Sequence, residues 1–589
     1  MQNAVAFANN DVATVAWSFG KKPDGCMGFA IYRIDDKGKE TVLPSHAVFP
    51  GKTIKPGQTT AEFPIQKFYW KDPYARLVAE KTGNRAFRYK IVPLEGMPGT
   101  LKPMTSLPFL ISNEITITHQ VSGYLGAYFN RGLISTQRVS RALKGKTDPG
   151  SLRSHIADKD DTLRASLSGD MVEALTGFVD RAKSSGKIYA ALYELGDEEL
   201  IAKLEGLGAR LQIVLSNSAT TDPITKKTSD GNDGARKRLA KTAGFKADRI
   251  MPSNHIGHNK FLVYVDKNKK PKAVLLGSTN WTSTGLCAQT NNTLIVDDAK
   301  VAARYLSYWK QIAADTKAAK GDSKSLQGTK FRTFNAKAAS FTLPDGESCA
   351  TWFSPCSPKA RSSSTKNEKV PVDMADVIAR IDAAKHAILF LAFYPGAPSL
   401  ANWSAAALRK NKTLFVRGCV TNKSASEGFY YSLKGMTVPK KVKGDKTPVK
   451  QDPRVIGAEA FNGKIIPNGW QKEILNAGFA IVHDKIMVID PFSDDCVVIT
   501  GSHNLGYKAS YDNDENFVII EGDKKLAVAY ATHVLDVYDH FAWRYLVKRL
   551  GRKADQSLKT TPKEWLAKYY DANGDITSAQ LKFWMQATT

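Results

Sequence analysis

The sequence predicts an α/β protein, with two pseudo-repeated αβ lobes packed around one shared active site and an N-terminal all-β sandwich before them. Three observations lead to this prediction. Residues 1–110 contain short alternating runs of apolar and polar residues, a helix-then-strand pattern occurs twice after residue 165, and each copy leads to a His-x-Lys sequence. A chain of 589 residues exceeds what one hydrophobic core usually organises, so several domains are expected.

Residues 1–110 are expected to form an antiparallel sandwich. Apolar runs around Trp17, Tyr32 and Tyr89 are separated by Gly, Pro and Asp turns and show no helical period. The placement of these aromatic residues resembles a fibronectin type III module. That resemblance implies a spacer or an adhesive surface without chemistry of its own.

Residues 111–164 are expected to be a helical connector. Apolar residues recur there at helical spacing, including Tyr124, Tyr128, Leu133 and Ile134. We therefore expect a helical segment that docks on the following lobe.

An internal repeat defines the two lobes, expected at residues 165–322 and 350–545. A helix that begins near Met171 in the first copy and near Met374 in the second is followed by a buried strand and then by another strand. Strands that alternate with helices in this order form largely parallel or mixed sheets.

The remaining segments are expected to be less regular. Small, polar and basic residues predict a linker at 323–349, and residues 546–589 are expected to form a helical tail. Residues 424–472 are rich in Lys, Gly and Pro, which predicts a long loop that covers the site or faces the substrate. Aromatic residues within this loop could meet a lipid interface or pack inside the loop; they are Phe429, Tyr430, Tyr431, Phe461 and Trp470.

The two His-x-Lys sequences are the candidate catalytic residues. His258 with Lys260, and His483 with Lys485, stand at the head of an alternating strand, so both side chains of a pair point to the same face. One such pair alone would carry little meaning, but here the second strand of each hairpin also ends in Gly-Ser-x-Asn. This brings further polar side chains near the strand heads: Ser278, Asn280, Ser502 and Asn504.

These residue types suit the cleavage of a phosphate ester. A neutral imidazole can attack phosphorus to form a covalent intermediate, and a protonated imidazole can give its proton to the leaving oxygen. Lysine ammonium groups with Asn and Ser donors can hold the non-bridging oxygens as charge builds up in the transition state. We therefore expect no metal ion and no cofactor.

The paired sequences resemble the HKD signature of the phospholipase D superfamily, across most of residues 165 to 545. The family pattern His-x-Lys-x4-Asp is met by His483, Lys485 and Asp490. In the first lobe Asp266 falls one residue late, and a bulge at the strand end could absorb the added residue.

The resemblance also implies unequal roles for the two histidines. Glu515 matches an acidic position that superfamily members use to orient a histidine, and Asn292 is the nearest counterpart in the first lobe. Unequal electrostatic settings suit one nucleophile and one general acid. By family precedent, His258 is expected to form the phosphohistidine and His483 to act as the acid.

Other patterns give weaker predictions. The six cysteines show no metal-ligand spacing, so buried reduced thiols are expected, although Cys349 and Cys356 are near enough in sequence to form a bridge. The stretch DANGDITSAQ from Asp571 does not meet the pattern of a calcium loop, because Lys582 stands where the bidentate acid would be.

The net charge of +26 indicates a polyanionic partner. The superfamily includes phospholipases D, phospholipid synthases and nucleases, so the motif indicates the reaction and not the substrate. A phospholipid or anionic membrane surface is expected as substrate, by resemblance to two-lobed phospholipases D, with hydrolysis and transfer to an alcohol both open. Nucleic acid is the alternative, and a non-catalytic phosphate-binding scaffold is a third reading that intact motifs disfavour. With both motifs in one chain, a monomer is expected to be active.

The N-terminal residues lack the basic start and the uninterrupted apolar run of a signal peptide. The apolar run from Ala387 is too short to span a bilayer, which needs roughly 20 residues. A cytoplasmic location is expected, with export by a signal-independent route left open.

Overall fold

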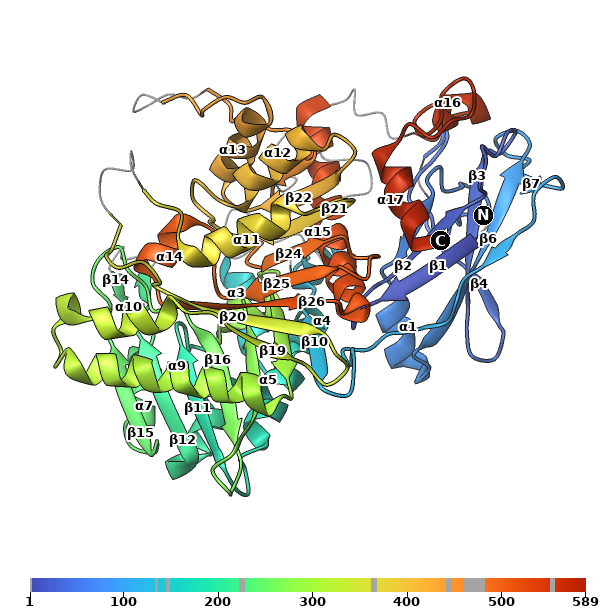
Figure 1. The fold of residues 1–589 in the computed structure, drawn as a ribbon. Helices are drawn as coiled ribbons and strands as arrows, with labels where there is room; N and C mark the ends of the chain where they lie inside the picture. Colours follow the sequence, from blue (N-terminus) through green and yellow to red (C-terminus); the bar gives the residue numbers. More distant parts are fainter. Residues whose placement is uncertain are drawn as a thin grey trace.

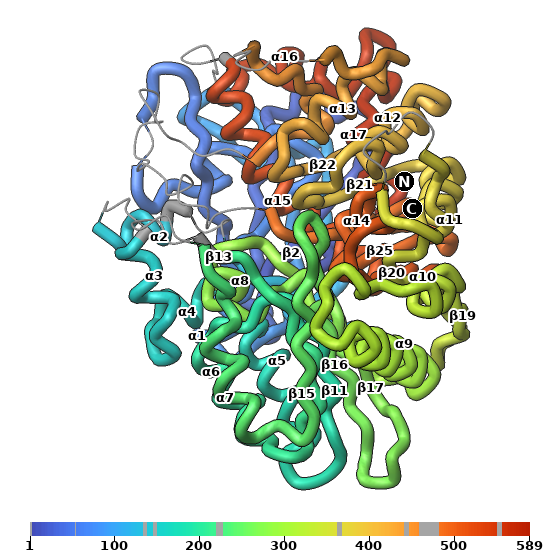
Figure 2. The backbone as a smooth tube through the Cα atoms, turned by 90° about the vertical axis from the view of Figure 1, so that its left-hand side faces the viewer, coloured from blue at the N-terminus to red at the C-terminus, as the bar shows by residue number. Residues whose placement is uncertain are grey.

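Two large mixed sheets, one from each repeat, form the body of the protein (Figure 1). The computed structural model describes residues 3–588 except 54, 133–135, 145–148, 222–227, 362–367, 441–446, 459–481 and 551–556. Two smaller antiparallel sheets lie at one end. After a 90° turn the first lobe, in green, occupies the lower part and the second lobe, in yellow to red, the upper part (Figure 2). The predicted α/β class with two pseudo-repeated lobes is confirmed.

The sheet of the first lobe has seven strands in the order β10-β18-β17-β16-β11-β12-β15. β11 pairs in parallel with β12 and β12 with β15, and the other pairs are antiparallel. The strands are β10 (Leu125–Phe129), β11 (Lys187–Leu192), β12 (Leu211–Ser216), β15 (Phe245–Arg249), β16 (Lys260–Val265), β17 (Pro271–Gly277) and β18 (Asn292–Val296). The helices are α2 (Thr136–Ala142), α3 (Pro149–Ala157), α4 (Thr162–Ser168), α5 (Met171–Asp180), α6 (Glu198–Glu205), α7 (Asp233–Leu239), α8 (Ser283–Cys287) and α9 (Ala299–Ala318), with a hairpin of β13 (Ala219–Thr221) and β14 (Thr228–Asp230).

The sheet of the second lobe has eight strands in the order β19-β20-β26-β25-β24-β21-β22-β23. The strands are β19 (Ala339–Thr342), β20 (Ser348–Ser354), β21 (Ala387–Ala392), β22 (Phe415–Val420), β23 (Val455–Gly457), β24 (Lys485–Ile489), β25 (Val497–Gly501) and β26 (Glu515–Glu521). The helices are α10 (Thr329–Asn335), α11 (Val372–Asp382), α12 (Leu400–Lys410), α13 (Lys423–Leu433), α14 (Tyr507–Asp512) and α15 (Lys524–Leu550). With β19 set aside, the two orders correspond strand for strand, so β16 and β24 hold equivalent positions.

Three segments differ from the sequence prediction. The helical spacing at Tyr124 and Tyr128 is misleading, because residues 125–129 form β10, a strand buried on both faces that shows no polar alternation. The expected linker contains α10 and β19. The expected loop from Ser424 begins inside α13, where Phe429 is fully buried in the core of the lobe; Phe461 and Trp470 lie outside the described residues.

The largest apolar cluster joins the two lobes. It combines side chains of the long helices α9 and α15, such as Trp309 and Phe541, with β16 and β24 side chains, such as Phe261 and Val488. Burying this surface between the repeats stabilises the face where the two strand heads meet.

The N-terminal region is built from two antiparallel sheets, β1-β2-β5 and β4-β3-β6-β7, with β8 and β9 also paired to β6. The strands are β1 (Asn3–Ala8), β2 (Ala13–Ser18), β3 (Gly28–Ile34), β4 (Glu40–Val42), β5 (Tyr69–Asp72), β6 (Ala86–Glu95), β7 (Lys102–Pro103), β8 (Leu110–Ile111) and β9 (Ile115–Thr116), with helix α1 (Ala75–Thr82). The tail helices α16 (Pro562–Leu566) and α17 (Ala579–Thr588) lie beside these sheets (Figure 1).

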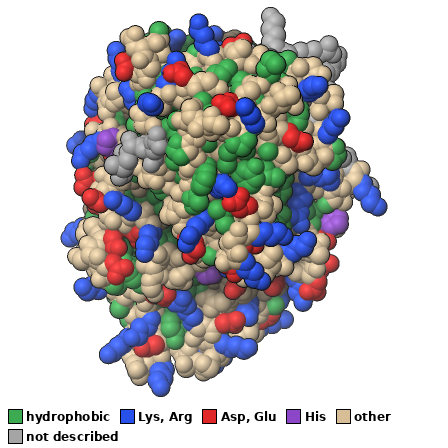
Figure 3. Space-filling view, turned by 90° about the vertical axis from the view of Figure 1, so that its right-hand side faces the viewer, with side chains coloured by type: hydrophobic (Ala, Val, Ile, Leu, Met, Phe, Trp, Pro, Cys, Tyr) green, Lys and Arg blue, Asp and Glu red, His purple; other side chains and the backbone are tan. Residues whose placement is uncertain are grey.

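Basic and acidic side chains are interspersed on the face that the N-terminal sheets present (Figure 3). The net charge of +26 is therefore not gathered into one uniform patch on that face.

Among the described residues, no helix combines the length and apolar character needed to cross a membrane. All six cysteines are buried and unpaired, Cys349 and Cys356 included.

Candidate active site

The two His-x-Lys pairs meet where the lobes face each other. Lys260 and Lys485 are the first residues of β16 and β24, and each histidine lies two residues earlier. The ring centroids of His258 and His483 are 6.3 Å apart. All four side chains are buried, with 1 to 3% of each residue exposed. The structure thus brings together all four residues that the sequence singled out.

Each strand head is held by the backbone of the opposite lobe. The His258 N–H donates to the carbonyl oxygen of Asp514 at 2.9 Å, and the His483 N–H donates to that of Thr290 at 3.1 Å. These reciprocal bonds tie the two lobes together at the site, so neither lobe forms it alone.

The side chains of the histidines are also held across the lobe boundary. His258 Nδ1 lies 2.8 Å from Glu515 Oε2, whereas His483 Nδ1 lies 2.9 Å from Asn291 Oδ1. A carboxyl group therefore orients one imidazole and an amide orients the other. The sequence predicted this unequal setting, but it indicated Asn292 and not Asn291 as the residue in the first lobe.

Asn291 is the equivalent of Glu515. The Ser278 hydroxyl donates to Asn291 Oδ1 at 2.8 Å, and the Ser502 hydroxyl donates to Glu515 Oε2 at 2.7 Å. In both lobes 13 residues separate the serine from its partner, a spacing that could have identified Asn291 from the sequence. Asn292 instead donates to Thr500 and Tyr530, away from the imidazole.

The two lysines have matching surroundings. Lys260 Nζ donates to the His258 carbonyl oxygen at 2.7 Å, and Lys485 Nζ to that of His483 at 2.6 Å. Each ammonium group also lies over an aromatic ring, 4.9 Å from the centroid of Tyr193 and 5.1 Å from that of Phe393 respectively. These rings, which follow β11 and β21, were not predicted as site residues, and they favour the charged form of each lysine.

The two asparagines of Gly-Ser-x-Asn also lie at the site. The Oδ1 atoms of Asn280 and Asn504 are buried and have no hydrogen-bond partner in the described part of the chain. Asn280 Nδ2 donates to Glu194, a carboxyl group that sequence reasoning missed. The residue equivalent to Glu194 in the second lobe is Tyr394, which is 52% exposed. The two sides of the site therefore differ here as well.

The two motif aspartates lie at the opposite ends of their strands from the histidines. Asp490 accepts hydrogen bonds from the backbone N–H groups of residues 385, 386 and 387 at 2.7 to 2.8 Å, which fixes the start of β21. Asp266 accepts from the N–H groups of Asn268 and Lys270 in the hairpin that follows β16. The register of this hairpin shifts at Tyr264 and Val265, as expected for the added residue. Neither aspartate joins the central group.

Burial and the clustered cations set the protonation of the site. Burial, reinforced by Lys260 for His258 and by Lys485 for His483, holds both imidazole pKa values well below their usual range. Burial lowers the pKa of Lys260 to about 7, and it lowers the pKa of Lys485 as well. Burial also raises the pKa of Glu515 to about 7, and it raises that of Glu194. An anion bound between the two lysines would favour the charged forms of these lysines and of the histidines.

The described residues contain no cluster of three His, Cys, Asp or Glu side chains arranged to hold a metal ion. The groups that can donate to an anion here are the ammonium groups of Lys260 and Lys485 and the side-chain amides of Asn280 and Asn504, since the serine hydroxyls already donate to Asn291 and Glu515. Such donors stabilise phosphate oxygens by charge-assisted hydrogen bonds.

The sequence profile of a family described as "Cardiolipin synthase, PLD-like domain" matches residues 178–313 and 377–536. Among solved structures, phosphatidylserine synthase from Haemophilus influenzae Rd KW20 is 12% identical, with 66% of this chain and 92% of that chain covered and a TM-score of 0.42. Nuc, a phospholipase D family member from Salmonella typhimurium, is 20% identical, with coverages of 33% and 95% and a TM-score of 0.21. Yeast tyrosyl-DNA phosphodiesterase is 10% identical, with coverages of 59% and 85% and a TM-score of 0.30.

A search of curated protein sequences gives no significant match. The family profile spans both lobes and both His-x-Lys pairs. A two-lobed α/β protein with paired His and Lys side chains at one site is the class that these features define. The chain belongs to the phospholipase D superfamily.

Proposed function

We propose that this protein is a phosphodiesterase that cleaves its substrate in two steps through a phosphohistidine on His258. The observation that carries the proposal is the pair of buried imidazole rings, 6.3 Å apart, with a carboxyl group on one and an amide on the other. Two such rings supply a nucleophile and a proton donor for one phosphorus atom.

In the first step His258 attacks. Its lowered pKa keeps the imidazole neutral, and Glu515 engages Nδ1, which leaves Nε2 as the nitrogen that bonds to phosphorus. The bond from phosphorus to the leaving oxygen breaks as the N–P bond forms. Glu515 stabilises the positive charge that develops on the ring, as carboxylates do for catalytic histidines elsewhere.

His483 gives the leaving oxygen its proton. A phosphodiester anion between Lys260 and Lys485 raises the pKa of neighbouring bases, because an opposite charge favours their protonated forms. His483 is thus protonated in the complex, although burial lowers its pKa in the free protein. In the second step it takes a proton from water or an alcohol, whose oxygen attacks phosphorus and releases His258.

The test uses bis(p-nitrophenyl) phosphate, whose leaving group needs little help from an acid. In His483→Ala the first step should persist while the second slows, giving a burst of about one nitrophenolate per protein molecule and a 32P-labelled or mass-shifted His258. His258→Ala should show neither burst nor label. A burst that survives in His258→Ala would contradict the assignment of the nucleophile.

For the substrate we propose a phospholipid headgroup ester, by hydrolysis or by transfer to an alcohol. Tyr394, 52% exposed beside the ring of Phe393 that contacts His483, suits the interface where aromatic side chains meet lipid headgroups. The description of the matched family, which names a cardiolipin synthase, supports the same class. A monomer should suffice, because one chain carries both His-x-Lys pairs.

Nucleic acid is the second candidate, favoured by the net charge of +26. Phosphatidylglycerol vesicles and single-stranded oligonucleotides, each incubated with wild-type protein and with His258→Ala, separate the two. Headgroup release without strand cleavage supports the lipid, and the reverse result supports nucleic acid.

A further inference from the structure

The first-lobe side of the site carries a carboxyl group, that of Glu194, which the two proposed steps leave unused. Glu194 follows Tyr193 just after the end of β11, and its side chain is half-buried. Asn280 Nδ2 donates to Glu194 Oε2, and the Ser218 hydroxyl donates to Oε1 at 3.3 Å. Both carboxyl oxygens thus meet donors, which suits the ionised form of the group.

The backbone fixes Glu194 beside the residues that would meet a phosphate. The Tyr193 N–H donates to the carbonyl oxygen of Asn259, inside the first His-x-Lys sequence, at 2.8 Å. The N–H of Trp281, the residue after Asn280, donates to the Glu194 carbonyl oxygen at 3.1 Å. The side-chain amide of Asn280 has two N–H groups, so it can donate one to Glu194 and the other to an anion at the site.

The carboxyl group of Glu194 also interacts with the lysines of both lobes. Burial raises its pKa, and the ammonium groups of Lys260 and Lys485 oppose that rise. A phosphate held by the same lysines is attracted by them and repelled by the carboxylate. Tyr394, at the equivalent place in the second lobe, has no carboxyl group, so this repulsion comes from one side only.

The charges of the proposed reacting complex balance for a phosphate that carries one negative charge. The two lysines and protonated His483 carry three positive charges, while Glu515, Glu194 and a phosphodiester carry three negative ones. A phosphomonoester brings a second negative charge at neutral pH, because its second pKa is about 6. It would leave one uncompensated charge in a buried site, which is unfavourable.

We propose that Glu194 makes the site select singly charged phosphodiesters over doubly charged phosphomonoesters. The inference rests on the proposed phosphodiesterase function and adds the residue that sets its specificity for charge. It also bears on product release. When water completes the second step the product is a phosphomonoester, whose second charge is repelled by Glu194, whereas a diester formed by transfer to an alcohol keeps a single charge.

The test compares ethyl phosphate and diethyl phosphate as inhibitors of bis(p-nitrophenyl) phosphate hydrolysis at about pH 8, where the first carries two charges and the second carries one. Glu194→Gln removes a negative charge, so each charge on the inhibitor should gain about ten-fold in affinity. The ratio of the two inhibition constants should therefore shift about ten-fold in favour of ethyl phosphate. Glu194→Asp keeps the charge and should retain the wild-type ratio. Glu198→Gln, at an exposed residue of α6, is the matched control and should leave both constants within about two-fold.

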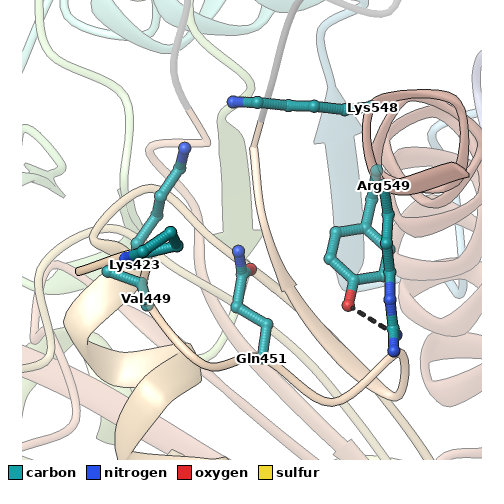
Figure 4. Close-up of a pocket in the computed structure, with 7 residues that line it drawn as sticks. Lys423, Val449, Gln451, Lys548 and Arg549 are labelled. Atoms are coloured by element: carbon teal, nitrogen blue, oxygen red, sulfur yellow. Dashed lines mark hydrogen bonds between the residues drawn. The ribbon is translucent and has the colours of Figure 1, made fainter. Parts of the chain in front are cut away.

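Inhibition of turnover is measured instead of total binding, because exposed basic side chains elsewhere attract the same esters. Arg549, which lines a hollow of about 300 Å³ at the edge of the second lobe, is one example (Figure 4). An ester bound there would not compete with the substrate, so it does not enter the ratio.

An equal change of both inhibition constants in Glu194→Gln would overturn the inference, since Glu194 would then only hold Asn280 in place. So would a ratio in Glu194→Asp that shifts as far as the ratio in Glu194→Gln. The wild-type protein gives a check that needs no variant: a preference for ethyl phosphate of more than about ten-fold would show that the lysines outweigh the carboxylate and would contradict the selection. If His258→Ala still hydrolyses bis(p-nitrophenyl) phosphate, the proposed function fails instead, independently of Glu194.

Discussion

At the residue scale, the two halves of the site differ mainly in the group that holds each imidazole. Glu515 and Asn291 occupy equivalent places, each 13 residues after a serine that donates to it. A carboxyl group can stabilise a positively charged imidazole, whereas an amide oxygen does so more weakly. The asymmetry therefore assigns the more charged intermediate to His258, in line with its proposed role as nucleophile.

Glu515→Gln should lower kcat by roughly 10²- to 10⁴-fold, because the neutral amide no longer stabilises the imidazolium and can impose the wrong tautomer. Glu521→Gln, on the same strand but beyond the site, is the matched control and should stay within about two-fold. Steady-state hydrolysis of bis(p-nitrophenyl) phosphate measures both. Equal activities in the two variants would remove Glu515 from the mechanism.

The lowered pKa of Lys260, about 7, predicts how anion binding depends on pH. Above that value the free protein holds a neutral amine, so binding a dianion such as tungstate takes up a proton, and affinity falls as pH rises. Linkage makes Lys260 contribute about one decade of Kd per pH unit above pH 7, and this contribution disappears below that pH. Inhibition constants for tungstate between pH 6 and 9 measure this, and Lys260→Arg should flatten the profile because Arg stays charged. A flat wild-type profile would contradict the prediction.

At the scale of elements, the two motif aspartates accept hydrogen bonds from backbone N–H groups, which indicates a structural role. Asp490→Ala should lower the free energy of unfolding by about 3 kcal/mol, because it leaves three backbone N–H groups at the start of β21 without their charged acceptor. Asp266→Ala, at the exposed hairpin of the first lobe, should cost distinctly less. Urea unfolding compares the two. We expect each folded variant to retain kcat, and a catalytic loss in Asp490→Ala without destabilisation would contradict the structural role.

The sequence predicted the lobes and the four central residues because the repeat is local: helix, strand and His-x-Lys recur in the same order in each half. It could not show which partner each histidine meets, since His258 and Glu515 are 257 residues apart and pair only when the lobes dock. Strand β10 escaped prediction because both of its faces are buried, which erases the alternation that marks a strand. Glu194 was not predicted as a site residue because a single acidic residue after a strand is not part of any recognisable sequence pattern.

At the scale of the whole molecule, the two ends of the chain share one core. Trp565 and Tyr569 of the tail pack with Trp17, Phe29 and Phe68 of the N-terminal region. Trp584 of α17 stacks on Tyr69 with centroids 4.8 Å apart. The N-terminal region is thus completed by the tail.

Because the tail completes this core, we predict that Trp565 stabilises the N-terminal region. Trp565→Ala should cost about 3–5 kcal/mol, because it opens a cavity in the shared core and removes the bond from the indole N–H to the Cys26 carbonyl oxygen, 2.8 Å long. Trp565→Phe keeps most of the packing and should lose only about 1–2 kcal/mol. Hydrogen exchange of β2 and β3 amides, read beside that of β16 and β24, locates the loss. Exchange that quickens equally in the lobes and in the N-terminal sheets would show that the shared core is not a separate cooperative unit.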